Sequence, residues 1–199
     1  MKLLIASANL HKVREFRQLL ANLGEWDIYS LKDFPDYTPP EETGDTFEKN
    51  ALIKARHAAD SFDMWVLADD SGLVVPSLNG APGVYSARYA GETATDIKNR
   101  LKLLNNLEGS SEKDRTAHFE CCIALIKKDK YEKCVTGSCE GFITSKEKGG
   151  NGFGYDPLFI KNGYNTTFAE MDETTKLKIS HRGKALSKLL LILERLKAD

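Results

Sequence analysis

The chain has 199 residues, of which 41% are hydrophobic, and a formal net charge of −1. This length is enough for one large domain or for two closely joined lobes. No Pro-, Gly- or Ser-rich linker, repeat or low-complexity tract divides the sequence, so we predict a single domain over residues 1–199. The nearly neutral charge gives no indication of a nucleic-acid partner.

The apolar segments are short. The longest apolar run spans five residues, 189–193, whereas a membrane-spanning helix needs about 20. Residues 3–6 supply only four apolar side chains after Lys2, which is too few for the apolar core of a secretory signal. We therefore expect no membrane association and a cytoplasmic location.

The first part of the chain alternates short apolar runs with helical spacing. We predict a strand over residues 3–7, a helix that begins at 9–12 and ends near Gly24, and a second strand over 27–30. Residues 33–44 carry three prolines and several acids, and they predict a loop. The pattern of Asp45 and Glu48 resembles a capping box, which predicts a helix from there to about Asp60.

The apolar run from Met64 to Ala68 predicts a buried strand that ends at Asp69-Asp70, with a Ser-Gly turn after it. Residues 76–91 predict an ordered functional loop. After it, Thr95 is a candidate helix cap, and the apolar face of that helix is Ile97, Leu101, Leu104 and Leu107.

The pattern changes in the second half of the chain. Strand-like segments over 116–126, 131–138 and 140–144 predict an antiparallel hairpin, so we expect a mixed sheet. A leucine stripe from Leu186 to Leu196 predicts a last helix. The four cysteines form no C-x-x-C pair and lie in this strand-like region, which favours reduced thiols in a sheet over zinc or disulfides: Cys121, Cys122, Cys134 and Cys139.

Paired acids are the most informative feature. Charged side chains beside a buried strand are costly unless a metal, a base or a substrate compensates them. Glu41, Glu42, Asp69 and Asp70 together offer only oxygen ligands, which suits Mg²⁺, with Mn²⁺ as an alternative, rather than zinc. A remaining carboxylate is able to deprotonate an attacking water. The competing interpretation makes Glu41 and Glu42 surface loop acids and Asp69-Asp70 a simple turn.

A second group of polar residues, Ser7 to Lys12, lies where a strand leads into a helix. The first amides of a helix attract anions, and a hydroxyl, an amide and a cation here suit phosphate. The segment lacks the glycines of a Walker A loop. An equally supported interpretation is that Asn9 only caps the helix and Lys12 is solvated. His11, His57 and His118 are interpreted as solvated or structural.

Three further segments carry candidate binding residues. The glycine-rich stretch 149–157 presents Phe153 for stacking and Asp156 for hydrogen bonding, although a glycine-rich hairpin with a buried Phe competes. His181 and Arg182 stand side by side at a helix start, where the helix dipole disfavours cations, and this indicates a ligand with acceptor oxygens. Arg88 is a candidate to contact phosphate or to pair with an acid.

Six segments occur in one order along the chain, and each alone is a weak signal. They are Ser-Ala-Asn-Leu-His-Lys (7–12), Glu-Glu-Thr-Gly-Asp-Thr-Phe-Glu-Lys-Asn-Ala (41–51), Ala-Asp-Asp-Ser-Gly-Leu (68–73), Gly-Ala-Pro-Gly-Val-Tyr-Ser-Ala-Arg-Tyr (80–89), Gly-Phe-Gly-Tyr-Asp-Pro (152–157) and Ser-His-Arg-Gly-Lys-Ala (180–185). Together they resemble the noncanonical purine nucleoside triphosphate pyrophosphatases, the inosine triphosphatase or Ham1-like family. The resemblance covers almost the whole chain. Ser7 stands where the family often has Thr, and it keeps the hydroxyl.

The resemblance implies an α/β fold with a long, mixed, twisted sheet flanked by helices, two lobes with a central cleft, and a homodimer. It implies Mg²⁺-dependent hydrolysis of ITP, dITP, XTP or dXTP to the monophosphate and pyrophosphate. Glu42 and Asp70 would bind Mg²⁺, and Asp70 would also accept the proton of the attacking water. The residues implied to bind substrate are Ser7, Ala8, Asn9, Leu10, His11, Lys12, Lys54, Asp69, Ser71, Phe153, Gly154, Tyr155, Asp156, Lys176, His181 and Arg182.

The chemistry of these residues is compatible with that function. A triphosphate carries several negative charges, and Lys12, Lys54, Arg88 and Lys176 are able to balance them. Arg182 always donates hydrogen bonds, so it favours the 6-oxo group of hypoxanthine or xanthine over the 6-amino group of adenine. Two alternatives are a Maf-like pyrophosphatase for modified pyrimidines and a nucleotide- or nucleic-acid-binding module without turnover. The segments 152–157 and 180–182 disfavour the first, and the acid cluster disfavours the second.

Overall fold

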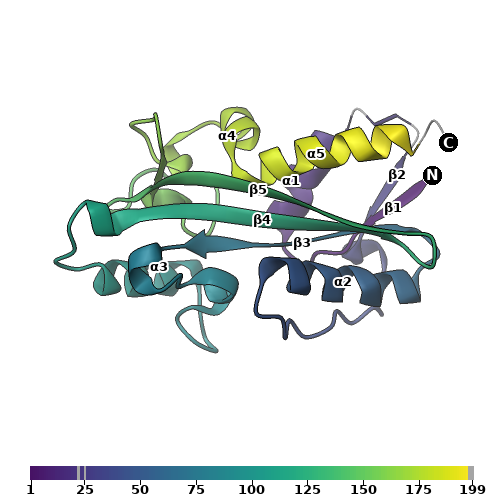
Figure 1. Ribbon diagram of the computed structural model, residues 1–199, viewed down its shortest axis with the longest axis horizontal. Helices are drawn as coiled ribbons and strands as arrows, with labels where there is room; N and C mark the ends of the chain where they lie inside the picture. The colour runs from purple at the N-terminus through teal and green to yellow at the C-terminus, as the bar shows by residue number, and fades with distance from the viewer. Residues whose placement is uncertain (22, 25, 197–199) are drawn as a thin grey trace. The chain divides into compact units, whose positions relative to one another are not determined.

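The structure is a computed structural model that describes residues 1–21, 23–24 and 26–196. In the described chain, six strands form one sheet in the order β2-β1-β3-β4-β5-β6 (Figure 1). The strands are β1 (Lys2–Ile5), β2 (Asp27–Ser30), β3 (Trp65–Val74), β4 (Thr116–Lys127), β5 (Tyr131–Ile143) and β6 (Phe159–Lys161). β1 pairs in parallel with β2 and β3, whereas β5 and β6 are antiparallel, so the predicted mixed α/β sheet is confirmed.

Five α-helices accompany the sheet in the described residues. They are α1 (Leu10–Leu20), α2 (Phe47–Ser61), α3 (Asp96–Asn106), α4 (Glu173–Ile179) and α5 (His181–Arg195). The chain folds as two compact units, each assembled from separate segments. The first unit contains residues 1–70, 121–137 and the segment from Arg182 onward, and the second contains 71–120 and 138–181. The described part of the chain holds no helix with the length and apolar character to span a membrane.

In the first unit, α1 and α5 share one hydrophobic core with the strands. Phe16 of α1 and Leu186 and Leu189 of α5 are fully buried against strand residues such as Ile5 and Ile123. Figure 1 shows α2 on the other side of β3 and β4 from α5. The buried face of α2 is mostly alanine, and these small side chains allow a helix to approach its neighbours closely: Ala51, Ala55, Ala58 and Ala59.

In the second unit, the core contains a cluster of phenylalanines among aliphatic side chains. Phe119, Phe159 and Phe168 contact one another with ring centroids 4.8 to 6.0 Å apart. Gly141 of β5 allows the close pairing with β6, because a Cβ at this position would lie 2.1 Å from the carbonyl oxygen of Ile160.

The apolar face predicted for α3 is confirmed at Leu104 and Leu107, which pack in the core of the second unit, and wrong at Ile97 and Leu101. Ile97 and Leu101 are 60% and 52% exposed, whereas Leu103 and Leu107 are fully buried. The packed stripe includes Asn99, whose side chain accepts a hydrogen bond from the amide of Ala90 and donates one to the carbonyl of Ala87. A polar side chain therefore docks this helix on the preceding loop, and a search for apolar periodicity overlooks it.

Two boundaries also differ from the predictions. α2 is capped by Thr46, whose hydroxyl accepts from the Lys49 amide, and not by Asp45. β3 continues through Asp69-Asp70 and on to Val74, so the acids lie inside a strand rather than at its end. The two strands predicted over 131–138 and 140–144 are one continuous strand, β5, which ends at Ile143, and neither β6 nor α4 was predicted.

Candidate active site

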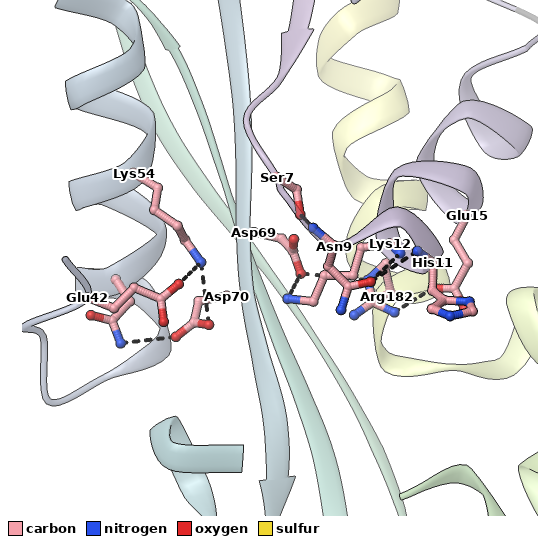
Figure 2. A network of polar contacts seen from close by, with 11 residues as sticks. Ser7, Asn9, His11, Lys12, Glu15, Glu42, Lys54, Asp69, Asp70 and Arg182 are labelled. Carbon is pink, nitrogen blue, oxygen red and sulfur yellow. Dashed lines mark hydrogen bonds and ion pairs between the residues drawn. The ribbon is translucent and has the colours of Figure 1, made fainter. Parts of the chain in front are cut away.

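Asp69 and Asp70 occupy successive positions of β3, and side chains alternate between the two faces of a strand. Figure 2 shows the result: Asp69 lies toward Lys12 and Arg182, whereas Asp70 lies toward Glu42 and Lys54. Both aspartates are buried, at 1% and 6% exposure. The two carboxylates therefore belong to two separate polar groups of the first unit.

The first group surrounds Asp69. Its Oδ2 lies 2.9 Å from Lys12 Nζ and 3.6 Å from Arg182 Nε. Arg182 is 2% exposed, and its Nη1 donates to Glu15 Oε2 at 2.5 Å. Burial alone would raise the pKa of Asp69, but the charges of Lys12 and Arg182 outweigh it and hold this pKa well below its usual range. Asp69 is thus an ionised counter-ion for two cations.

The second group surrounds Asp70. Asn50 Nδ2 donates to Asp70 Oδ2 at 3.1 Å, and the Gly44 amide in turn donates to Asn50 Oδ1 at 2.7 Å. Lys54 Nζ lies 2.6 Å from Glu42 Oε1 and 3.5 Å from Asp70 Oδ1. Burial raises the pKa of Asp70, and Glu42 adds to the effect, although Lys54 opposes it. Burial works against the charge of Lys54, but the nearby carboxylates dominate and raise its pKa, so it is ammonium at neutral pH.

The predicted metal ligands Glu42 and Asp70 therefore come together, since both contact one Lys54 nitrogen. The described residues hold no cluster of three or more His, Cys, Asp or Glu side chains arranged for a metal. Mg²⁺ is commonly held by only one or two carboxylates, with waters and substrate phosphates as its other ligands. The donor set fits that pattern. Glu41, by contrast, is exposed, and Asp69 points to the other side of β3.

The Ser7–Lys12 segment caps α1. Asn9 Oδ1 accepts hydrogen bonds from the amides of His11 and Lys12, and Ser7 Oγ accepts from the Asn9 amide. The capping interpretation of Asn9 is confirmed. The solvated interpretation of Lys12 is wrong, because its ammonium pairs with Asp69. The segment lies at the surface: Ala8, Asn9, Leu10 and His11 are exposed and Ser7 is half-buried.

In the second unit, Asp156 organises the glycine-rich segment. Its Oδ2 accepts from the Phe153 amide at 2.9 Å and from Lys176 Nζ at 2.6 Å. Lys176 Nζ also lies 4.9 Å from the centre of the Phe153 ring, which is within cation–π range. Phe153 is half-buried rather than buried, which differs from the alternative of a hairpin loop with a buried Phe.

The conformation of this loop is fixed from several sides. Asp96 accepts from the Gly154 amide at 2.7 Å, and Arg100 donates to the Gly154 carbonyl at 2.9 Å. Gly152 has a φ of +76°, and a Cβ there would lie 2.1 Å from Asp156 Oδ2. Tyr155 donates to the Ser86 carbonyl at 2.9 Å, and burial raises the pKa of its phenol. The loop is therefore preorganised before any ligand binds.

Three other predicted binding residues have contacts or exposure that do not point to a ligand. His181 is 5% exposed, and its ring stacks on Phe119 with centroids 4.7 Å apart. Arg88 is exposed, and its guanidinium lies 5.3 Å from the centre of the Tyr85 ring. Ser71 is half-buried in β3. These positions do not by themselves assign a ligand contact.

The sequence analysis assigned no role to the residues that position the predicted site residues. Glu15 is the partner of Arg182, Asn50 orients Asp70, and Asp96 with Arg100 holds the backbone of Gly154. One signal was available: Asn50 and Lys54 are four residues apart and therefore share a face of α2. The pairing of Glu15 with Arg182, 167 positions apart, has no local signal.

The fold and the site define a class of protein: an α/β protein with a mixed sheet, one strand of which carries two buried, ion-paired aspartates. The model of the Ham1 family matches residues 3–192, and the chain belongs to the Ham1 family. It is 52% identical over 198 residues to a dITP/XTP pyrophosphatase of Protochlamydia amoebophila, covering 99% of this chain and 100% of that protein. It is 50% identical to a dITP/XTP pyrophosphatase of Chlamydia trachomatis serovar L2, covering 100% and 96%.

The fold agrees with a solved relative. The structure of a HAM1 protein from Coxiella burnetii superposes with a TM-score of 0.89 at 44% identity, and the match covers 98% of this chain and 99% of that one. The family inferred from the six sequence segments is thus confirmed, together with its α/β fold.

Proposed function

We propose that this chain is a nucleoside triphosphate pyrophosphatase that hydrolyses noncanonical purine nucleoside triphosphates, ITP, dITP, XTP and dXTP, and so cleanses the nucleotide pool. The products are the nucleoside monophosphate and pyrophosphate. The observation that carries the proposal is the meeting of Glu42 and Asp70 at Lys54 Nζ in a member of the Ham1 family. The relatives named dITP/XTP pyrophosphatases, at 52% and 50% identity, support the substrate class.

Phosphate binding is assigned to cations of the first unit. Lys54 lies beside Asp70 as an ammonium ion. Lys12 pairs with Asp69, which precedes Asp70 on β3. We assign the exposed backbone and side chains of residues 7–12 to the same task, because helix N-termini attract anions. Arg88 and Ser71 are assigned to further substrate contacts.

Glu42 and Asp70 would hold Mg²⁺, with Mn²⁺ as an alternative. When bound, the ion would neutralise phosphate charge and polarise the phosphoryl oxygens. Asn50 orients Asp70 through Oδ2, and we assign Oδ1 to accept a proton from the attacking water. Burial raises the pKa of Asp70, which increases its proton affinity. The bond that breaks joins the α-phosphorus to the oxygen that bridges to the β-phosphate.

Base recognition is assigned to the half-buried Phe153, whose ring would stack on the purine. The loop residues Gly154, Tyr155 and Asp156 would line the edge of the base, and Lys176, His181 and Arg182 would complete its recognition. Lys176 and Arg182 have no acceptor, so they favour a 6-oxo over a 6-amino purine. Arg182 also holds Glu15, so substitution of this residue tests stability and selectivity together.

We further propose that the protein acts as a homodimer in the cytoplasm, without nucleic-acid or membrane partners. Sedimentation equilibrium tests the assembly directly. A mass of two 22.2 kDa chains is expected, and a monomer mass at all concentrations would contradict it.

A panel of triphosphates tests the substrate assignment. Pyrophosphate release is measured for ITP, dITP, XTP and dXTP beside ATP, GTP and a pyrimidine triphosphate under one set of conditions. We expect the four 6-oxo substrates without a 2-amino group to have the highest kcat/KM. A preference for modified pyrimidines, or nucleotide binding without turnover, would contradict the proposal.

In the same assay, Arg182→Ala should narrow the preference for ITP over ATP, measured as the ratio of the two kcat/KM values. An unchanged ratio would move base recognition to other residues.

A further inference from the structure

Two cysteines outside the proposed catalytic and binding residues lie on the same face of neighbouring strands. Cys122 lies on β4 and Cys134 on β5, and a turn over residues 128–130 connects these strands directly, so they are antiparallel neighbours (Figure 1). The largest influence on the pKa of each thiol is the other thiol, which indicates that the two side chains lie near one another. Side chains on one face of neighbouring strands lie close to the separation that a disulfide bridges.

Alternation along the two strands confirms that the thiols share a face. Cys121 and Ile123 of β4 pack in the core with α1 and α5, so Cys122 faces the opposite side. On β5, Val135 packs against that same core, whereas Glu132 pairs with Arg56 of α2 at 2.5 Å. Cys134 lies two residues after Glu132 and therefore shares its face. Both thiols thus lie on the α2 side of the sheet.

The two thiols differ in access and acidity. Cys134 is half-buried, and the nearby thiol of Cys122 lowers the pKa of its thiol, while burial, Glu48 and Glu132 oppose that shift and Arg56 favours it. Cys122 is fully buried, and the nearby thiol of Cys134, together with burial, raises its pKa. The more accessible and more acidic thiol is the one expected to react first with an oxidant.

We propose that Cys122 and Cys134 are an oxidisable dithiol that closes to an intrachain disulfide when the protein meets hydrogen peroxide. The thiolate of Cys134 attacks one peroxide oxygen, the O–O bond breaks, and the released hydroxide takes up the thiol proton to leave as water. Cys134 is then a sulfenic acid. The sulfur of Cys122 attacks the sulfur of Cys134, the S–O bond breaks, and the hydroxyl leaves with the Cys122 proton as a second water. Two thiols lose two electrons, and one peroxide gains them.

The other cysteines provide matched controls. Cys121 precedes Cys122 on β4 but lies on the other face, fully buried, and burial raises the pKa of its thiol to about 12. Cys139 is fully buried in the core of the second unit. Neither is expected to join the bond.

The test uses the wild-type chain of 199 residues. It is treated with stoichiometric hydrogen peroxide, remaining thiols are alkylated, and intact mass and tryptic peptides are measured without reductant. We expect the loss of two hydrogens per chain, alkylation of two of the four cysteines, and a bond that tandem fragmentation places between Cys122 of peptide 116–127 and Cys134 of peptide 134–146. A thiol reductant should restore four alkylated cysteines.

Variants sharpen the assignment. Cys121→Ala and Cys139→Ala should keep the cross-link, whereas Cys122→Ala and Cys134→Ala should abolish it, with circular dichroism to verify the fold. The proposal is overturned if peroxide-treated wild-type protein keeps four alkylatable thiols, or if fragmentation finds Cys121, Cys139 or a second chain in the bond. The wild-type result decides the question even where a variant fails to fold, and it is independent of the proposed enzymatic activity.

Discussion

Asp69 and Asp70 are chain neighbours whose pKa values shift in opposite directions. Asp69 faces Lys12 and Arg182, which stabilise its charge, whereas burial raises the pKa of Asp70. A carboxylate with increased proton affinity is suited to accept a proton, and one with two cationic partners is suited to hold them in place. The alternation of side chains along one strand therefore separates two roles.

Asp70→Asn is the first test at this scale. Because a general base contributes about 10²–10⁴-fold, we expect kcat for ITP to fall by that factor while the fold persists. Pyrophosphate release and circular dichroism measure the two effects. Asp60→Asn is the matched control, since Asp60 is an exposed aspartate that pairs with Lys128. Turnover of the Asp70 variant near the wild-type value would exclude Asp70 as the base.

Asp69 predicts a pH dependence of stability. Its native pKa lies below the unfolded value of 3.8, so its contribution is complete above that pH and is lost as pH falls toward the native pKa. Asp69→Asn leaves Lys12 and Arg182 without this counter-ion, and we expect the free energy of unfolding at neutral pH to drop by about 3–5 kcal/mol. Urea unfolding across the acid range should show a flatter pH dependence in the variant. An unchanged slope would contradict the assignment.

Among the elements, the sequence predicts best where a local signal decides the outcome. Asn9 caps α1, Thr95 caps α3 and the leucine stripe of α5 is buried at Leu186, Leu189 and Leu193, because caps and apolar stripes depend on neighbouring residues. The end of β3 and part of the packed face of α3 were predicted incorrectly for a different reason. Their packed positions include Asp69, Asp70 and Asn99, whose burial depends on partners distant in the sequence.

The capping of α2 allows a sharp comparison of two adjacent residues. The hydroxyl of Thr46 accepts from the Lys49 amide, whereas Asp45 forms an exposed ion pair with the Lys49 side chain. We expect Thr46→Ala to lower the free energy of unfolding by about 1 kcal/mol. Asp45→Ala should lower it by less, because exposed ion pairs contribute about 0–1 kcal/mol. Chemical denaturation that ranks the two variants in the reverse order would restore the capping box predicted from the sequence.

At the scale of the whole molecule, each polar group is assembled from segments far apart in the chain. Arg182 of α5 meets Glu15 of α1, and Asn50 of α2 meets Asp70 of β3. The six family segments identified Glu42, Asp70 and Lys12 as site residues, and the family resemblance added Lys54 just beyond the second segment. The sequence could not show that Asp69 and Asp70 serve separate groups, because the strand was predicted to end at this pair, whereas β3 continues through it.

Metal-dependent hydrolysis of ITP tests the central claim most directly, namely that Glu42 and Asp70 together hold a divalent ion beside the triphosphate. Phosphorus NMR identifies the products for wild-type protein and Glu42→Gln over a range of Mg²⁺ concentrations. We predict pyrophosphate as the product, no turnover with a chelator, and an increase of about 10–100-fold in the Mg²⁺ concentration that Glu42→Gln requires for half-maximal rate. Turnover that persists without a divalent metal, or release of orthophosphate alone, would contradict the account.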